Sequence, residues 1–243
     1  MAWALIVTGL PAAGKSDAGA VLAALLRADG YTVSARSDKQ ALEDQVWLDI
    51  RAHGRPGPAP GSLAGRHSVL LNPGAPPGRL QMLFRDGNAL NSAHRALIAD
   101  VAHLIGDGDD RHVVLVEWAY GADYPYEGEP LLQSATHLVR WLGEAGVRSR
   151  VWLVEIVASY IERERRNRAR PDGVPPVEFA RHFREEGHLS PEDERSFDGR
   201  CVRISNADLP AEVFRRRIAG IYHALLREWL SGQTERERAR LSP

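Results

Sequence analysis

The amino-acid sequence predicts an α/β domain in which helices cover both faces of a parallel β-sheet. Short apolar runs typical of buried parallel strands alternate along the chain with longer segments whose apolar residues recur at helical spacing. Neither an internal repeat nor a domain linker interrupts this alternation over the 243 residues. Parallel strands that follow one another need right-handed crossovers, and these crossovers place helices on both faces of the sheet.

Five apolar runs have the length and composition of buried strands. They cover residues 3–8, 31–37, 112–119, 151–157 and 200–205. Other segments carry apolar residues every three or four positions, which predicts helices that pack one face on the sheet. These segments are the stretch after Ser16 and residues 38–50, 90–105, 131–142, 158–170, 177–186 and 214–229.

Turn and cap signals separate these elements in chain order. Glycine and acidic residues at 29–30, 86–88 and 106–110 flank the first and third helices, and prolines within 171–176 break an arginine-rich helix. The charged tail 234–243 is expected to fray.

An insert is predicted over about 54–87. Glycine and proline crowd residues 54–78, and only 68–71 and 80–84 resemble strands. We therefore expect a loop or an irregular hairpin, which either lies near an acceptor substrate or is mobile.

The first helix is preceded by a phosphate-binding motif. Residues 9–16 follow the pattern of glycine, four residues, glycine, lysine and serine, with a strand before and a helix after. Two glycines let successive N–H groups point at phosphate oxygens, a lysine in this solvent-facing loop reaches the β- and γ-phosphates, and the serine hydroxyl can ligate Mg²⁺. We assign nucleotide binding to Gly9, Ala12, Ala13, Gly14, Lys15, Ser16 and Asp17.

This motif resembles the Walker A loop of P-loop NTPases. The later features are most similar to the small kinases of that superfamily, namely nucleoside and nucleotide kinases, polynucleotide 5′-hydroxyl kinases and small-metabolite kinases. The resemblance is specific over the first 40 residues and architectural over the rest. It implies one P-loop kinase-like domain over 1–243, a three-layer sandwich with a five-stranded parallel sheet of order 2-3-1-4-5, and a helical lid over about 160–190.

Asp38 follows the second strand, at the carboxyl edge where ligands bind in open α/β sheets. In the kinases that this chain resembles, a carboxylate at the matching place accepts the proton of the attacking hydroxyl. An alternative is that Asp38 caps the helix that follows it. Arg36 and Asp86 are further candidates for substrate binding.

Glu117 ends the third strand at the same edge. An apolar strand that finishes in an acid resembles the Walker B pattern, whose acid holds Mg²⁺. Because glutamate replaces the commoner aspartate, a role as base or substrate ligand stays open, as does pairing with a lid arginine. Glu155 has the matching place on the fourth strand and is less favoured.

Three arginines of the predicted lid share one helical face. Arg163, Arg166 and Arg170 stand at i, i+3 and i+7. The resemblance implies that they neutralise charge on the transferred phosphoryl group, a task suited to a bidentate guanidinium. The alternative is a solvated helix held by the pairs Glu162–Arg166 and Glu164–Arg168.

Other polar and aromatic residues allow two interpretations each. The resemblance places Asn206, after the fifth strand, beside the adenine ring, although a turn and helix cap explain it equally well. Tyr120, Tyr124 and Tyr126 either line an acceptor pocket or pack locally. The histidines show no metal-ligand spacing, and His94 is expected at the surface or in the core.

The composition limits partners and location. A net charge of −1 predicts no general attraction to nucleic acid or membranes. Cys201 is the only cysteine, so an intrachain disulfide is impossible, and it is predicted as a buried strand residue. No apolar run approaches the ~20 residues of a membrane span, and the N-terminus is a core strand, so we expect a cytoplasmic protein.

These observations predict a kinase that uses ATP and Mg²⁺ to phosphorylate a hydroxyl of a small molecule, with a nucleoside or nucleoside-like metabolite favoured. The predicted catalytic residues are Lys15, Asp38, Arg163, Arg166 and Arg170, with Ser16 and Glu117 at the metal and Asp38, Glu117, Arg36 and Asp86 at the substrate. Two alternatives are a kinase acting on a hydroxyl of DNA or RNA and a non-catalytic nucleotide-binding regulator.

Overall fold

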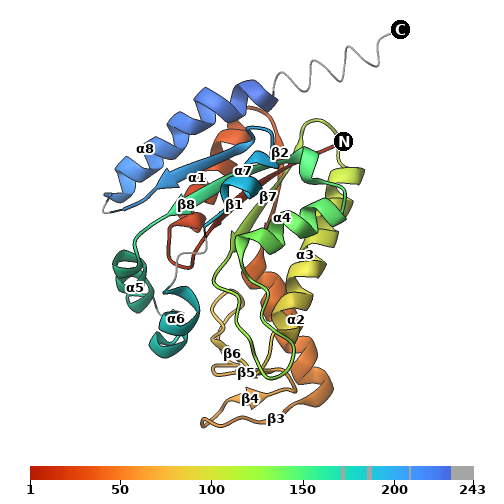
Figure 1. Cartoon of the computed structure of the whole chain (residues 1–243), viewed down its shortest axis with the longest axis vertical. Helices are drawn as coiled ribbons and strands as arrows, with labels where there is room; N and C mark the ends of the chain where they lie inside the picture. Colours follow the sequence, from red (N-terminus) through yellow and green to blue (C-terminus); the bar gives the residue numbers. More distant parts are fainter. Residues whose placement is uncertain (171–172, 185–187, 208, 231–243) are drawn as a thin grey trace.

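Five parallel strands form the main sheet within residues 1–170, 173–184, 188–207 and 209–230, which the computed structural model describes (Figure 1). They are β1 (Trp3–Gly9), β2 (Thr32–Ser37), β7 (His112–Ala119), β8 (Val151–Val157) and β9 (Cys201–Ser205). Their order is β2-β7-β1-β8-β9. Numbered within this sheet alone, the order is 2-3-1-4-5, so the predicted P-loop kinase-like topology is confirmed.

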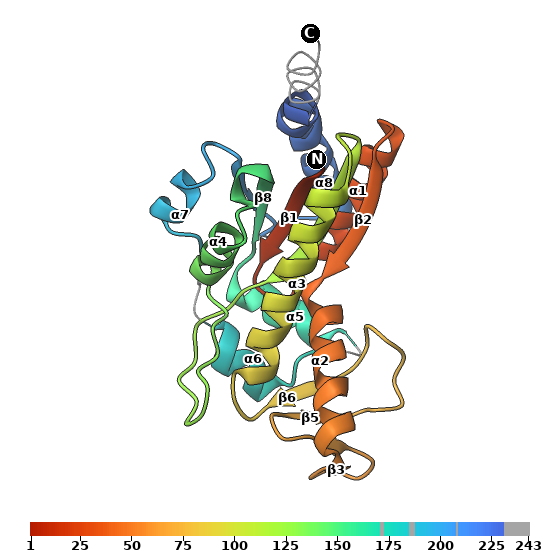
Figure 2. The same cartoon turned by 90° about the vertical axis from the view of Figure 1, so that its right-hand side faces the viewer.

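Helices cover both faces of this sheet, as predicted (Figures 1 and 2). They are α1 (Lys15–Ala28) and α8 (Ala211–Ile221), which continues as a π-helical turn (Tyr222–Leu226), on one face, and α3 (Asn88–Asp107) and α4 (Ala135–Glu144) on the other. The central strand β1 contributes to both layers, since Leu5 and Val7 lie in one apolar cluster and Ile6 in the other. This division follows from the alternation of side chains along a strand.

The predicted insert is folded and packs beside α2 (Asp38–His53), as Figure 1 shows. It forms a second, antiparallel sheet in the order β3-β4-β5-β6. Its strands are β3 (Arg55–Pro56), β4 (Leu63–Ala64), β5 (Ser68–Leu70) and β6 (Met82–Phe84). The sequence predicts only the last two of these strands, because two-residue strands are too short to show periodicity.

Apolar packing and buried acceptors together join the insert to α2. Val46 of α2 and Leu80 of the insert belong to one buried cluster. Between them, the buried carboxylate of Glu43 accepts hydrogen bonds from the backbone N–H groups of Gly78 at 2.7 Å and Leu80 at 3.3 Å. The position of the insert therefore depends on which residues of α2 face it.

The segment predicted as a lid contains α5 (Tyr160–Arg168) and α6 (Pro176–Phe183). The Ser159 side chain caps α5 by accepting a hydrogen bond from the N–H of Glu162, so α5 begins later than predicted. The helix also ends earlier, at Arg168, which leaves Arg170 outside it. A short 3₁₀ turn (Arg148–Arg150) precedes β8, and α7 (Pro191–Arg195), which is absent from the sequence prediction, follows the lid.

Other differences from the prediction are local. Helix α4 begins later than predicted because Leu131 forms an isolated β-bridge with Tyr124. Cys201 is half-buried at the start of β9, and burial raises the pKa of its thiol to about 12, so the thiol stays protonated. The predicted frayed tail 234–243 lies outside the described residues. Among the described helices, none has the length and apolarity needed to cross a membrane.

Replacing Asp49 of α2 by alanine should loosen the insert while the main sheet stays folded. The Asp49 carboxylate accepts hydrogen bonds from the backbone N–H groups of residues 66–68, each at 2.9 Å. Leaving such amides without an acceptor costs on the order of 1–3 kcal/mol. Native-state hydrogen exchange should become faster across 54–87 and stay unchanged in β1 and β7.

The matched control is Asp44→Ala, which removes an exposed carboxylate from the same helix. Equal exchange rates across the insert in the two variants would contradict the anchoring role of Asp49.

Candidate active site

The loop between β1 and α1 has the curled backbone that the 9–16 motif predicts. Gly9 and Gly14 have φ angles of 150° and 109°, and Ala12 has a φ of 63°, which is unfavourable for alanine. A Cβ atom on Gly9 would lie 2.4 Å from the carbonyl oxygen of Ile156, so no larger residue fits there. Gly14 is the N-cap of α1, and the positive end of the helix dipole therefore faces the loop.

Lys15 is buried, although the loop that carries it is predicted to face solvent. The residue is 9% exposed, and its Nζ donates hydrogen bonds to the carbonyl oxygens of Gly9 at 3.0 Å and Leu10 at 3.1 Å. Burial lowers the pKa of the ammonium group from 10.5 to about 8, although the neighbouring carboxylates of Asp38 and Glu117 raise it. The curled loop surrounds its own lysine, which a linear pattern does not show.

Side chains from the lid and from the end of β9 hold the outer side of this loop. Arg166 donates to the carbonyl oxygens of Ala12 at 3.5 Å and Ala13 at 3.3 Å. The buried side-chain amide of Asn206 donates to the carbonyl oxygen of Ala13 at 2.7 Å, and the backbone carbonyl oxygen of Asn206 accepts from Arg166 at 3.1 Å. Because these carbonyls are engaged from outside, the loop is held in its curled shape, and Asn206 supports it directly.

Ser16 and Glu117 meet at the carboxyl edge of the sheet. The Ser16 hydroxyl donates to Oε2 of Glu117 at 2.8 Å. Strand β7 continues for two residues beyond Glu117, and Gly19 of α1 leaves room for the carboxylate, since a Cβ there would lie 3.3 Å from Oε1. Asp17 faces away and pairs with Arg215 at 3.0 Å.

This pair of oxygen ligands fits a magnesium ion. Hydroxyl and carboxylate oxygens are the ligands that Mg²⁺ prefers, and it usually keeps waters and phosphate oxygens as its other ligands. Within the described residues, no group of three or more histidine, cysteine, aspartate or glutamate side chains could hold a metal on its own. Ser16 and Glu117 would therefore hold the ion together with a bound nucleotide.

Asp38 joins the ends of two neighbouring strands. It is the first residue of α2, and its carboxylate accepts hydrogen bonds from the N–H of Lys39 at 2.7 Å and from the N–H of Ala119, at the end of β7. The alternative role as N-cap is wrong, since Ser37 occupies that position and accepts from Gln40. Burial raises the pKa of Asp38, opposed by Lys15 and the two backbone hydrogen bonds, which makes this carboxylate a stronger base.

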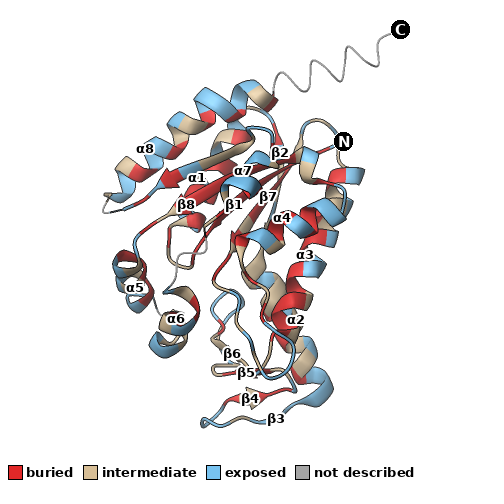
Figure 3. Ribbon diagram, viewed as in Figure 1, coloured by how far each residue is buried: buried red, intermediate tan, exposed pale blue. Residues whose placement is uncertain are grey.

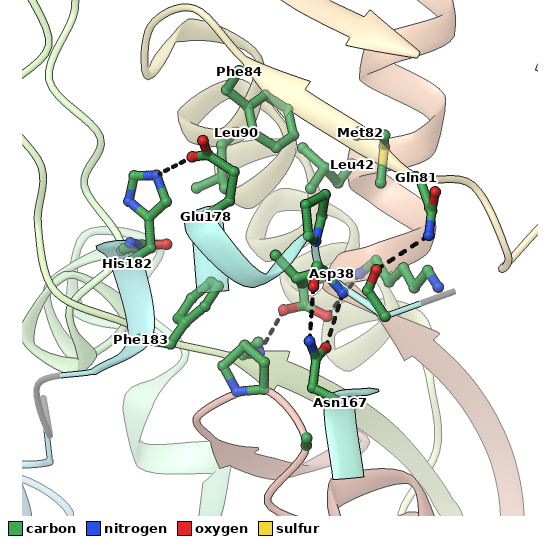
Figure 4. Close-up of a pocket in the computed structure, with 18 of the residues that line it drawn as sticks. Asp38, Leu42, Gln81, Met82, Phe84, Leu90, Asn167, Glu178, His182 and Phe183 are labelled. Atoms are coloured by element: carbon green, nitrogen blue, oxygen red, sulfur yellow. Dashed lines mark hydrogen bonds and ion pairs between the residues drawn. The ribbon is translucent and has the colours of Figure 1, made fainter. Parts of the chain in front are cut away.

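A cavity of about 250 Å³ opens beside these groups (Figure 4). Its wall at the P-loop end includes Lys15, Ser16, Asp38 and Glu117. The other walls come from α2, from the insert strand β6, from α3, from the loop that follows β7, and from the lid. The lining residues from these elements include Leu42, Leu80, Gln81, Met82, Phe84, Leu90, His94, Tyr126, Gln133, Asn167, Arg170, Glu178, His182 and Phe183. The cavity therefore extends from the loop of residues 9–16 to the insert and α6.

Two predicted substrate ligands do not reach this cavity. Arg36, on β2, pairs with Asp100 of α3 at 2.5 Å. Asp86 accepts hydrogen bonds from the N–H of Asn88 at 2.9 Å and from Nδ1 of His67 at 2.8 Å. Neither lines the cavity. Arg36 is therefore held by α3, and Asp86 accepts from the first residue of α3.

Glu155 is structural. It is fully buried on β8 and accepts hydrogen bonds from the hydroxyl of Tyr120 at 2.6 Å, Nε of Arg203 at 2.5 Å and the N–H of Leu189 at 3.2 Å. Burial alone would raise its pKa, but the hydrogen bonds it accepts bring that pKa down to about 2. Glu155 of β8 therefore holds the segment around Leu189, which follows the lid, against the main sheet.

The three lid arginines do not share one environment. Arg163 is fully buried and donates to the backbone carbonyls of Ala158 at 3.0 Å and Phe183 at 2.9 Å, so it joins α5 to α6. Arg166 contacts the P-loop, and its predicted pair with Glu162 is confirmed at 2.7 Å. The second predicted pair, Glu164–Arg168, is also confirmed. Arg170 lines the cavity.

Sequence reasoning misses the residues of the cavity that lie on the insert and on α6. Met82 and Phe84 come from a strand within a segment predicted as a loop or hairpin, and Glu178 and His182 face the cavity from α6. The i, i+4 spacing of Glu178 and His182 is a signal, but only the packing of α6 shows which way that face points. Among the three tyrosines, Tyr126 lines the cavity.

No protein-family model matches the sequence, and no curated protein matches it. Solved structures do match. A sugar kinase from a Janibacter species, in its unliganded structure, has a TM-score of 0.52 and 12% sequence identity, covering 89% of this chain and 92% of that chain. An APS kinase, CysC, from Mycobacterium tuberculosis in complex with AMPPNP and APS has a TM-score of 0.47 and 14% identity, covering 92% and 98%.

Kti12 from Chaetomium thermophilum, in complex with ADP-AlF3, has a TM-score of 0.41 and 14% identity, covering 91% of this chain and 98% of that chain. At such identities, the match to the sugar kinase shows the fold alone. The chain thus has the fold of small P-loop kinases, and the particular family is not defined by these matches.

The depressed pKa of Lys15 should appear in the pH dependence of stability. Between about pH 8 and the ordinary lysine value, the unfolded chain binds more protons at this site than the folded chain does, so the folded state gains stability as pH rises. Urea unfolding from pH 7 to 10.5 should show wild type gaining up to about 3 kcal/mol relative to Lys15→Met. Other titrating groups cancel in this difference, and a difference that stays constant with pH would contradict a buried ammonium.

Proposed function

We propose that this protein is a kinase that transfers the γ-phosphoryl group of ATP to a hydroxyl of a small, nucleoside-like molecule. The observation that carries this proposal is the cavity beside the P-loop, where Lys15, Ser16, Asp38 and Glu117 share one wall. A phosphate-binding loop, a buried base and a pocket for an acceptor thus lie side by side, as phosphoryl transfer requires.

The P-loop residues would bind the nucleotide through their amides and through Lys15. A triphosphate entering the loop would offer Lys15 anionic oxygens in place of the carbonyls of Gly9 and Leu10. Ser16 and Glu117 would hold Mg²⁺, which supplies positive charge to offset the charge of the phosphates. The shape of the loop and the oxygen pair both support this assignment.

Asp38 would act as the general base. The acceptor oxygen forms a bond to the γ-phosphorus, the bond from that phosphorus to the β,γ-bridging oxygen breaks, and ADP leaves with the bonding electrons. The proton of the acceptor hydroxyl passes to the Asp38 carboxylate. Two backbone hydrogen bonds orient this carboxylate, and burial raises its pKa, which supports its use as a base.

Arg166 and Arg170 of the lid would neutralise the negative charge on the transferred phosphoryl group. Arg166 already contacts the P-loop backbone, and Arg170 lines the cavity close enough to Lys15 to lower the pKa of its ammonium. Arg163 would act as a positioning residue through its backbone contacts between α5 and α6.

A small-molecule acceptor is better supported than a nucleic acid. The insert and the lid both contribute walls to a cavity of about 250 Å³, whereas a DNA or RNA strand needs a longer basic groove. The net charge of −1 also disfavours a polyanion. A non-catalytic nucleotide-binding regulator has no need of a buried base facing such a cavity.

The direct test is phosphoryl transfer from radiolabelled ATP to a panel of nucleosides and other small alcohols in the presence of Mg²⁺. We expect a labelled product with wild type and none above background with Lys15→Ala, because Lys15 is the ammonium group nearest the phosphates. Slow ATP hydrolysis with no labelled acceptor across the panel would favour the regulator. Labelled oligonucleotide, lost steeply with added salt, would favour the nucleic-acid kinase.

Asp38→Asn should reduce turnover by ~10²–10⁴-fold, the usual share of general base catalysis. The asparagine side chain keeps one acceptor oxygen but places its NH₂ group against the N–H of Lys39 or of Ala119. The free energy of unfolding should therefore fall by about 1 kcal/mol while the protein stays folded. Binding of AMPPNP, measured by calorimetry, should be nearly unchanged, because the P-loop supplies that affinity. Near wild-type turnover in the folded variant would show that Asp38 is only a structural link between strands.

A further inference from the structure

The end of the cavity away from the P-loop has its own chemistry (Figure 4). Glu178 and His182 reach it from α6, and Phe84 and Leu90 face it from the insert and from α3. The Glu178 carboxylate lies 3.3 Å from Nε2 of His182. The carboxylate of Glu178 therefore lies at the opposite end of the cavity from Asp38.

Most of the other polar side chains along the walls form hydrogen bonds with the protein backbone. The Gln133 amide donates to the carbonyl of Ala122 at 2.6 Å, and that of Gln81 donates to Gly173 at 3.3 Å. Asn167 both donates to and accepts from the backbone of Val174, at 2.7 and 2.9 Å. The middle of the cavity therefore offers mainly apolar surface, from residues such as Leu42, Met82 and Phe183.

Two imidazole rings in the lining each have a buried nitrogen that lacks a partner. Nδ1 of His94 and Nδ1 of His182 make no hydrogen bond in the described part of the chain, and both residues line the cavity. Burial lowers the pKa of His94 to about 3 and also lowers that of His182, so both rings are neutral near pH 7. A neutral imidazole does not attract an anion.

We infer that the acceptor is an uncharged molecule with an apolar ring and an N–H donor remote from its reacting hydroxyl, as in a nucleoside, and that Glu178 determines specificity by accepting a hydrogen bond from that donor. This inference rests on the proposed kinase function. It assigns the hydroxyl to the Asp38 end, the ring to the wall formed by β6 and the lid, and the donor to Glu178.

The same lining disfavours two related classes of acceptor. A sugar would bring several hydroxyls into the middle of the cavity, where most side chains are apolar, and each unsatisfied hydroxyl costs free energy. A nucleoside monophosphate would bring a second phosphate group. Among the described lining residues, the cations are Lys15, Lys39 and Arg170, which lie in the P-loop, beside Asp38 and near Lys15 respectively. The far end carries the carboxylate of Glu178, whose cationic partner Arg181 does not line the cavity.

The test is acceptor binding by calorimetry in the presence of AMPPNP and Mg²⁺, which requires no phosphoryl transfer. The panel contains adenosine, guanosine, cytidine, uridine and thymidine, their 5′-monophosphates, and the sugars ribose and glucose. We expect at least one nucleoside to bind at least tenfold more tightly than its monophosphate and than either sugar. If no nucleoside binds, or if a monophosphate or a sugar binds most tightly, the inference is overturned.

Glu178→Gln keeps the shape of the side chain and removes its charge. It should weaken binding of the preferred nucleoside about tenfold and raise its KM similarly, with kcat nearly unchanged. Arg181→Ala is the matched control, because Arg181 pairs with Glu178 at 3.1 Å on the solvent side and does not line the cavity. Unchanged binding in Glu178→Gln, or an equal loss in Arg181→Ala, would show that Glu178 only stabilises α6.

This design separates the inference from the proposal on which it rests. Nucleosides that bind through Glu178 without being phosphorylated would refute the kinase function and leave the acceptor assignment standing. A sugar that binds and is phosphorylated would refute the acceptor assignment and support the kinase.

Discussion

A buried ammonium group is the constraint around which this protein is organised. Lys15 is enclosed by the loop that precedes it, and its charge must be met by carbonyl oxygens and by the carboxylates of Asp38 and Glu117. These groups meet because the parallel pairing of β1, β2 and β7 brings the ends of the three strands to one edge of the sheet. The lowered pKa reflects the free-energy cost of this burial, which the phosphates of the proposed nucleotide would offset.

Helix α2 connects this charged edge to the cavity. Its first residue, Asp38, binds the end of β7, and two of its later acidic residues, Glu43 and Asp49, hold the insert by its backbone amides. The insert strand β6 then forms a wall of the cavity. One rigid helix thus fixes the distance between the carboxylate proposed as base and the surface proposed to hold the acceptor, which favours a preorganised site.

The arginines of the lid show how strongly environment decides the use of one residue type. Arg163 is consumed by backbone carbonyls inside the lid, Arg166 supports the P-loop from outside, and Arg170 lines the cavity. Their spacing suggests one shared face, yet α5 ends at Arg168 and separates the third from the other two. A guanidinium can serve any of these roles, because its donors suit carbonyl oxygens as well as phosphates.

The sequence by itself determined the parallel sheet, its flanking helices and the P-loop, because apolar periodicity and the glycine pattern are local signals. It also placed Asp38 and Glu117 at the sheet edge, since strand ends mark that edge. Only the tertiary structure decided that Lys15 is buried, that Arg36 and Asp86 turn away from the cavity, and that Glu178 faces it. These outcomes depend on how helices and the insert pack, and contacts between residues far apart in sequence leave no periodic signal in the chain.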